Sequence, residues 1–87
     1  MQAPVGILVL TNTEEVTYAN QAMLSLVGAD SVNEIVLKLA EIKIDEIPIL
    51  EYFRKNPCAT SGHIEWACTQ RSEKAELIIN ARDISHT

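Results

Sequence analysis

The hydrophobic pattern of this 87-residue chain changes its period twice. Residues 5–10 are almost continuously apolar, and residues 15–18 alternate between polar and apolar side chains after a turn-forming stretch at 11–14. This pattern predicts an N-terminal β-hairpin whose first strand is central or covered on both faces. Near the other end, residues 64–69 and 75–81 alternate again on either side of a polar turn. The two ends of the chain therefore predict β-strands.

The middle of the chain predicts helices. From Ala19 to Val27 the apolar residues recur with a helical period, with Asn20 placed as the N-cap and Gly28 as the C-cap. A second helix start follows, since Ser31 and Glu34 have the spacing of a capping box.

The next stretch, residues 35–44, predicts a short helix that continues into an extended connection. Pro48 marks a further helix start, Asn56 ends that helix, and residues 58–62 are interpreted as a loop. Four strands around a helical middle predict an α+β fold, with one antiparallel sheet and short helices packed on one face.

Length and charge exclude several classes of protein. At 87 residues the chain is expected to form a single domain with a thin core, for which a homodimer interface would provide support. The net charge of −5, with scattered basic residues, argues against a nucleic-acid partner. There is no apolar run of membrane-spanning length and no basic region of a signal peptide, so we expect a cytoplasmic domain without direct membrane insertion.

Several motifs together resemble the PAS family of sensory domains. Residues 16–22 (Val-Thr-Tyr-Ala-Asn-Gln-Ala) are similar to the strand end and helix start of that family, and residues 26–29 (Leu-Val-Gly-Ala) to its helix end. Residues 31–35 resemble the family's "s-x-x-E-[IL]" segment, and residues 82–85 (Arg-Asp-Ile-Ser) its C-terminal "r-D-I-[TS]" motif. The resemblance implies that residues 1–87 form one PAS-like domain with a sheet of four to five strands, either abbreviated or cut before a signalling helix.

The chain departs from the family pattern in three places. The first turn usually reads Asp-x-x-Gly, and Thr11 and Glu14 occupy those positions. The later hairpin lacks the usual Asp-Gly at residues 71–74. Only four strands are counted where the family commonly has five. Either one strand is short or lost, or the last strand lies beyond Thr87 and leaves an open sheet edge beside the first strand that favours dimerisation.

Four large side chains are candidates for lining a ligand pocket: Tyr18, Met23, Phe53 and Trp66. Each fits an ordinary hydrophobic core equally well. In the family, haem-binding members resemble one another in a histidine on the long helix, and residues 46–56 contain none. Neither cysteine lies in the motif of the covalent flavin photosensors. We therefore expect no haem and no covalent flavin, while a small-molecule ligand remains open.

The sequence gives little support for catalysis or for a metal site. His63 stands near Glu65, but no companion nucleophile motif accompanies it. The intervals between Cys58, His63 and Cys68 do not match a zinc knuckle, and the two cysteines are expected to be buried free thiols. We expect no catalytic residue, no metal and no enzyme activity in this domain.

The resemblance implies a sensory function. A ligand or partner would bias the packing of the sheet and helices, and the change would pass to an output domain of the same chain, such as a histidine kinase or nucleotide cyclase. In the family the aspartate of the C-terminal motif helps to fix the following helix, so Asp83, Ile84 and Ser85 are assigned to signal output, with Asn20 as the structural helix start. The alternative is a ligand-free structural dimerisation module.

Overall fold

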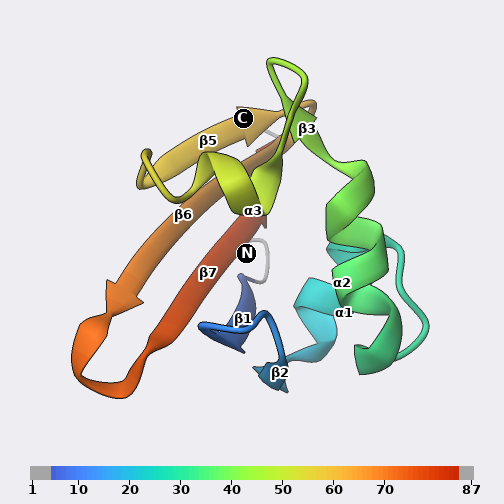
Figure 1. The fold of residues 1–87 in the computed structure, drawn as a ribbon. Helices are drawn as coiled ribbons and strands as arrows, with labels where there is room; N and C mark the ends of the chain where they lie inside the picture. The colour runs from blue at the N-terminus through green and yellow to red at the C-terminus, as the bar shows by residue number, and fades with distance from the viewer. Residues whose placement is uncertain (1–4, 85–87) are drawn as a thin grey trace.

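The computed structural model describes residues 5–84 of the chain. Its main feature is a five-stranded antiparallel sheet in the order β2-β1-β7-β6-β5, with a separate two-stranded hairpin and three short α-helices (Figure 1). The elements are β1 (Gly6–Thr11), β2 (Val16–Ala19), α1 (Gln21–Val27), α2 (Val32–Glu41), β3 (Lys43–Ile44), β4 (Ile47–Pro48), α3 (Ile49–Tyr52), β5 (Cys58–Ser61), β6 (Ile64–Arg71), η1 (Ser72–Lys74) and β7 (Glu76–Asp83). The predicted α+β class is confirmed.

The period-two pattern of the strands separates the two faces of the sheet. On β6, Trp66 and Cys68 are buried, while Ala67 and Thr69, which alternate with them, are exposed. On β7, Ile79 and Ala81 are buried in the same way. The register pairs Trp66 with Ala81 and Cys68 with Ile79, so the buried side chains of neighbouring strands share one face. That face of the sheet packs against the helices and lines the hydrophobic core.

The fifth strand lies in the stretch that was interpreted as a loop. Residues Cys58–Ser61 form β5, which pairs with β6 as Cys58 with Ala67 and Ser61 with Ile64. Of the alternatives, the short strand is the one present, whereas the expectations of a lost strand and of a last strand beyond Thr87 were wrong. The predicted open edge beside the first strand was also wrong, because β1 lies between β2 and β7. The outermost strands of this sheet are β2 and β5.

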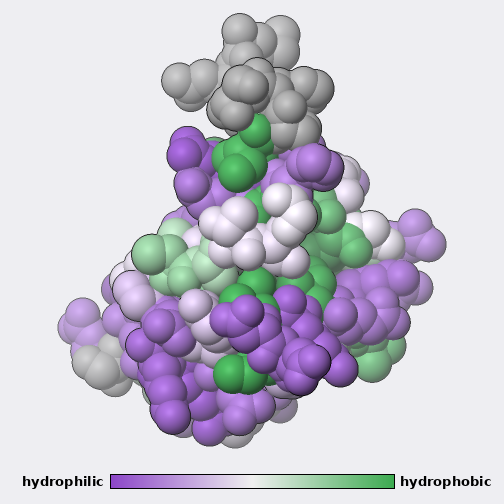
Figure 2. Space-filling view, turned by 90° about the horizontal axis from the view of Figure 1, so that it is seen from above, coloured by the Kyte–Doolittle hydropathy of each residue, from purple (hydrophilic) through white to green (hydrophobic). Residues whose placement is uncertain are grey.

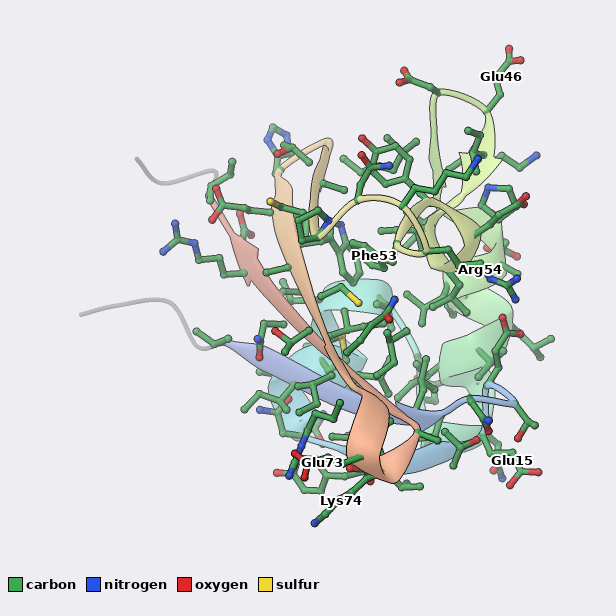
Figure 3. All side chains as sticks on the ribbon, turned by 60° about the vertical axis from the view of Figure 1, so that its left-hand side comes forward. Glu15, Glu46, Phe53, Arg54, Glu73 and Lys74 are labelled. Atoms are coloured by element: carbon green, nitrogen blue, oxygen red, sulfur yellow. The ribbon has the colours of Figure 1, made fainter. Side chains whose placement is uncertain are left out.

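All three α-helices pack on the same side of the sheet, so the fold has two layers (Figure 3). The fully buried side chains between the layers come from both: Leu8, Leu10, Met23, Ile35, Leu39, Ile49, Trp66 and Ile79. Seen from the end that carries the β3–β4 hairpin, most of the surface is hydrophilic, with hydrophobic patches between (Figure 2). None of the helices within residues 5–84 has the length and apolar character needed to cross a membrane.

The ends of the first two helices agree with the sequence pattern to different degrees. Gly28 closes α1 in the left-handed conformation, with φ of 75°. At the start of α2, the side chain of Ser31 makes no capping hydrogen bond, which differs from the predicted capping box. The Glu34 carboxylate reaches one residue beyond the N-cap instead, because its Oε2 accepts a hydrogen bond of 3.1 Å from the backbone N–H of Asp30.

The first turn holds a non-glycine residue in a conformation that favours glycine. Glu14, at the family's glycine position, has φ of 66°. The turn is held by the backbone N–H of Thr11, which donates to the Glu15 carbonyl at 2.8 Å. The Thr11 hydroxyl oxygen also accepts from the Glu15 N–H at 3.1 Å. These bonds offset the strain at Glu14.

Replacing Glu14 with glycine is expected to raise the free energy of unfolding by about 0.5–1 kcal/mol, because a side chain is disfavoured in the left-handed region. The matched control is Glu15→Gly, which removes the same charge where φ is not positive. That variant is expected to lower stability by a similar amount. Urea unfolding of both variants at neutral pH measures the difference. Equal effects of the two substitutions would show that charge, and not the backbone, determines the result.

Candidate ligand site

The four predicted pocket residues do not gather in one place. Met23 and Trp66 are fully buried in the core, and Phe53 is 3% exposed. Tyr18 lies on β2 with 53% of its surface exposed. Since it pairs with Val9, between the buried Leu8 and Leu10, its side chain lies on the sheet face away from the helices.

Phe53 borders a cavity of about 250 Å³ at one end of the sheet, which none of the other three lines, and Trp66 borders a separate cavity beside β5. The cavity beside Phe53 lies between the first turn, the α3 region and the turn end of the β6–β7 hairpin. Figure 3 shows Phe53 and Arg54 beside α3, across from Glu73 and Lys74 at the hairpin tip. The lining residues are Thr11, Asn12, Glu14, Leu50, Phe53, Arg54, Gln70, Arg71, Ala75, Glu76 and Leu77. Its volume lies just below the range typical of sites for drug-sized ligands.

The chemistry of this cavity is that of an amphiphilic site. Leu50, Phe53 and Leu77 supply apolar surface, while Arg54 and Gln70 supply hydrogen-bond donors. Arg54 has no carboxylate within 4.0 Å among residues 5–84, whereas Arg82 is paired with Glu65. The cavity can therefore accept a small molecule with an apolar body and a polar or anionic end.

Sequence reasoning missed most of this lining, because the residues come from three separate segments. Arg54, Gln70 and Leu77 carry no motif, and Gln70 is an exposed polar residue at the end of a strand. Strand alternation was the one signal that could have identified Gln70, because it places this residue on the same face of β6 as Trp66 and Cys68.

The indole N–H of Trp66 is buried and has no hydrogen-bond acceptor among residues 5–84. A buried donor without a partner costs about 1–3 kcal/mol of stability. The Trp66 ring therefore stabilises the core by its apolar surface, while the desolvation of its N–H lowers that stability.

Asn20 joins the first helix to the first strand through its side chain. Its Oδ1 accepts a hydrogen bond from the Met23 N–H at 3.0 Å, which caps α1. The same oxygen accepts from the Ile7 N–H at 2.9 Å, and Nδ2 donates to the Val5 carbonyl at 3.0 Å. One side chain thus connects the start of α1 to two backbone groups at the start of the N-terminal hairpin.

The residues assigned to signal output lie at the end of β7. Asp83 is the last residue of that strand and pairs with Ile64 of β6. The Ile84 N–H donates to the His63 carbonyl at 2.8 Å, which extends the contact between the two strands. Ser85 lies outside the described residues.

The cysteines lie on opposite faces of the sheet. Cys58 is exposed, which corrects the expectation that both thiols are buried, whereas Cys68 is buried; both are free. Burial raises the pKa of the Cys68 thiol to about 11, so it stays protonated at neutral pH. His63 is exposed in the β5–β6 turn. Within residues 5–84, no three histidine, cysteine or acidic side chains lie close enough together to hold a metal ion.

Comparison with known proteins agrees with this architecture. The family model described as "PAS domain" matches residues 2–65, nearly three quarters of the chain. No curated protein and no solved structure matches the chain. The sheet continues past the matched residues through the rest of β6 and all of β7. PAS domains are generally non-catalytic sensory modules. With the family model covering most of its length and a five-stranded antiparallel sheet beneath one layer of short helices, the chain belongs to the PAS domain family of sensory and signalling modules.

Proposed function

We propose that this PAS domain senses a small amphiphilic molecule in the cavity beside Phe53 and relays its binding along β7 to an output domain of the same chain. The observation that carries the proposal is the position of β7. Its first residues, Glu76 and Leu77, line the cavity, and its last residue is Asp83. The strand pairs with both β1 and β6 over most of its length. A change at the cavity therefore acts on an element that leads directly to the C-terminal motif.

The relay works as a population shift. A ligand that binds one packing of α3 against the β6–β7 hairpin more tightly than another favours that packing by its difference in affinity. The Ile64–Asp83 pair and the hydrogen bond from Ile84 to the His63 carbonyl are the contacts that would change at the output end. The output we propose is a cytoplasmic histidine kinase or nucleotide cyclase domain.

The test uses octanoate as an anionic probe and octanol as its neutral counterpart, with amide chemical shifts as the readout. We expect octanoate to move the signals of Phe53 and Leu77 first and that of Asp83 in the same titration. Gln70→Trp fills the cavity from an exposed position and is expected to abolish these shifts. Leu37→Trp is the matched control, because Leu37 is 69% exposed on α2 and does not line the cavity. Octanoate shifts that survive in Gln70→Trp would refute this cavity as the site.

A second function, a ligand-free structural dimerisation module, is favoured by the packed interior. Met23, Leu39 and Trp66 are all fully buried between sheet and helices. Native mass spectrometry of the purified protein separates the two functions, since a bound small molecule supports sensing and an empty dimer supports the structural module.

A further inference from the structure

Two cavities of this domain share part of their lining. The second, which we call the α2 cavity, has a volume of about 510 Å³ and lies between α2 and the β4–α3 segment. Glu14, Leu50 and Arg54 line both the α2 cavity and the cavity beside Phe53. A molecule longer than either cavity can therefore reach from one to the other across these three side chains.

The shared wall offers an apolar path between the cavities. Leu50 and Arg54 are four residues apart, which makes them neighbours on the helical turn that begins with α3. The Phe53 N–H donates to the Ile49 carbonyl at 3.0 Å and continues that turn beyond α3. Leu50 is half-buried and Arg54 is exposed, so an alkyl chain can contact the leucine and the methylene stem of the arginine while the guanidinium stays in water.

The two cavities differ in the uncharged residues that line them. Each is lined by two acidic and two basic side chains, so the balance of charge does not distinguish them. In the described part of the chain, every uncharged residue of the α2 cavity is apolar: Val36, Leu39, Ala40, Pro48 and Leu50. The cavity beside Phe53 also has Thr11, Asn12 and Gln70, which supply hydrogen-bonding groups. The polar end of an amphiphile is therefore favoured beside Phe53 and its apolar end in the α2 cavity.

An anionic end has donors at the far side of the cavity beside Phe53. Gln70 and Arg71 are adjacent at the end of β6, and both line this cavity but not the α2 cavity. Arg71 has no carboxylate within 4.0 Å among residues 5–84. A carboxylate can therefore accept hydrogen bonds from the Gln70 amide and the Arg71 guanidinium.

We propose, building on the ligand site inferred above, that its ligand is an unbranched fatty acid with a chain longer than that of octanoate. The carboxylate binds at Gln70 and Arg71, and the chain crosses Leu50 and Arg54 into the α2 cavity. Octanoate is confined to the cavity beside Phe53, whereas each further methylene group that enters the α2 cavity is removed from water and increases the affinity. Because the longer chain contacts both α2 and α3, it also holds these two helices together.

A comparison of octanoate with dodecanoate, each below the concentration at which it forms micelles, tests the shared site through amide chemical shifts. We expect both acids to move the signals of Phe53 and Leu77, and dodecanoate alone to move those of Val36 and Leu39. Dodecanoate is expected to bind about tenfold more tightly, a gain that the burial of about two methylene groups supplies.

Ala40→Trp fills the α2 cavity from an exposed position of α2. Leu37→Trp is the matched control, because Leu37 is exposed on the same helix and lines neither cavity. Circular dichroism verifies that both variants fold. We expect Ala40→Trp to bind octanoate as the wild type does and to lose the gain for dodecanoate, whereas Leu37→Trp keeps it.

The outcomes separate this proposal from the one on which it is built. If the gain for dodecanoate persists in Ala40→Trp, or if dodecanoate leaves the signals of Val36 and Leu39 unmoved, the shared site is wrong while the octanoate site stands. If octanoate itself leaves Phe53 and Leu77 unmoved, the octanoate site is wrong and the shared site fails with it.

Discussion

Asn20→Ala is expected to lower the free energy of unfolding by about 2–4 kcal/mol, as measured by urea denaturation at one low protein concentration. The loss of the N-cap of α1 accounts for about 1 kcal/mol. The remainder arises because the Ile7 N–H and the Val5 carbonyl lose the side-chain partners that Asn20 supplies. This is a large fraction of the 5–15 kcal/mol that stabilises a typical domain.

Two control variants separate the contributions of Asn20. Asn20→Asp keeps an oxygen that accepts from both Met23 and Ile7 but loses the donor to the Val5 carbonyl, so a loss of about 1 kcal/mol is expected. Asn33→Ala removes an exposed asparagine from α2 and is expected to change stability by less than about 0.5 kcal/mol. If Asn20→Ala costs no more than Asn33→Ala, the side chain does not hold the strand to the helix.

The fold was predictable from sequence wherever a strand or helix buries one clear face. The alternation at Ile64–Thr69 and the helical period from Ala19 to Val27 both reflect burial, so β6 and α1 were placed correctly. The strand β5 (Cys58–Ser61) was not, because it is a short edge strand in which only Ala59 is buried. Its strand conformation depends on pairing with β6, and the hydrophobic pattern of residues 58–61 alone does not indicate that pairing.

The small β3–β4 hairpin was missed for a related reason. Its two turn residues, Asp45 and Glu46, both have positive φ, a conformation for which Asn-Gly is the usual signal. The sequence carries no such signal at that point.

The candidate ligand site was the least predictable part. Large apolar residues were chosen as pocket candidates, yet large apolar residues are also the first to be buried, as Met23 and Trp66 are. The lining comes instead from segments that meet only through the sheet register and the packing of α3. Phe53 lies at the border between core and cavity and therefore fits both descriptions.

At Gly6 the first strand lies close against the first helix. A Cβ atom added there would lie 2.9 Å from Met23 Cα and 3.1 Å from Leu26 Cδ1. The first of these atoms is backbone, so it can move only if α1 moves. Elsewhere in a strand, alanine in place of glycine is expected to stabilise a protein by about 0.5–1 kcal/mol. The close approach predicts the opposite sign at this position.

Gly6→Ala is expected to destabilise the domain by about 1–3 kcal/mol, the usual cost of overpacking, and to accelerate amide hydrogen exchange in α1 more than in β6. Urea unfolding and native-state exchange measure the two effects. Combining Gly6→Ala with Leu26→Ala tests the cause: because the Met23 backbone remains in the way, removing the leucine should recover only a minor part of the loss. A Gly6→Ala variant more stable than the wild type would show that α1 can withdraw from β1 at no cost, and that the contact at Gly6 does not fix the position of the helix.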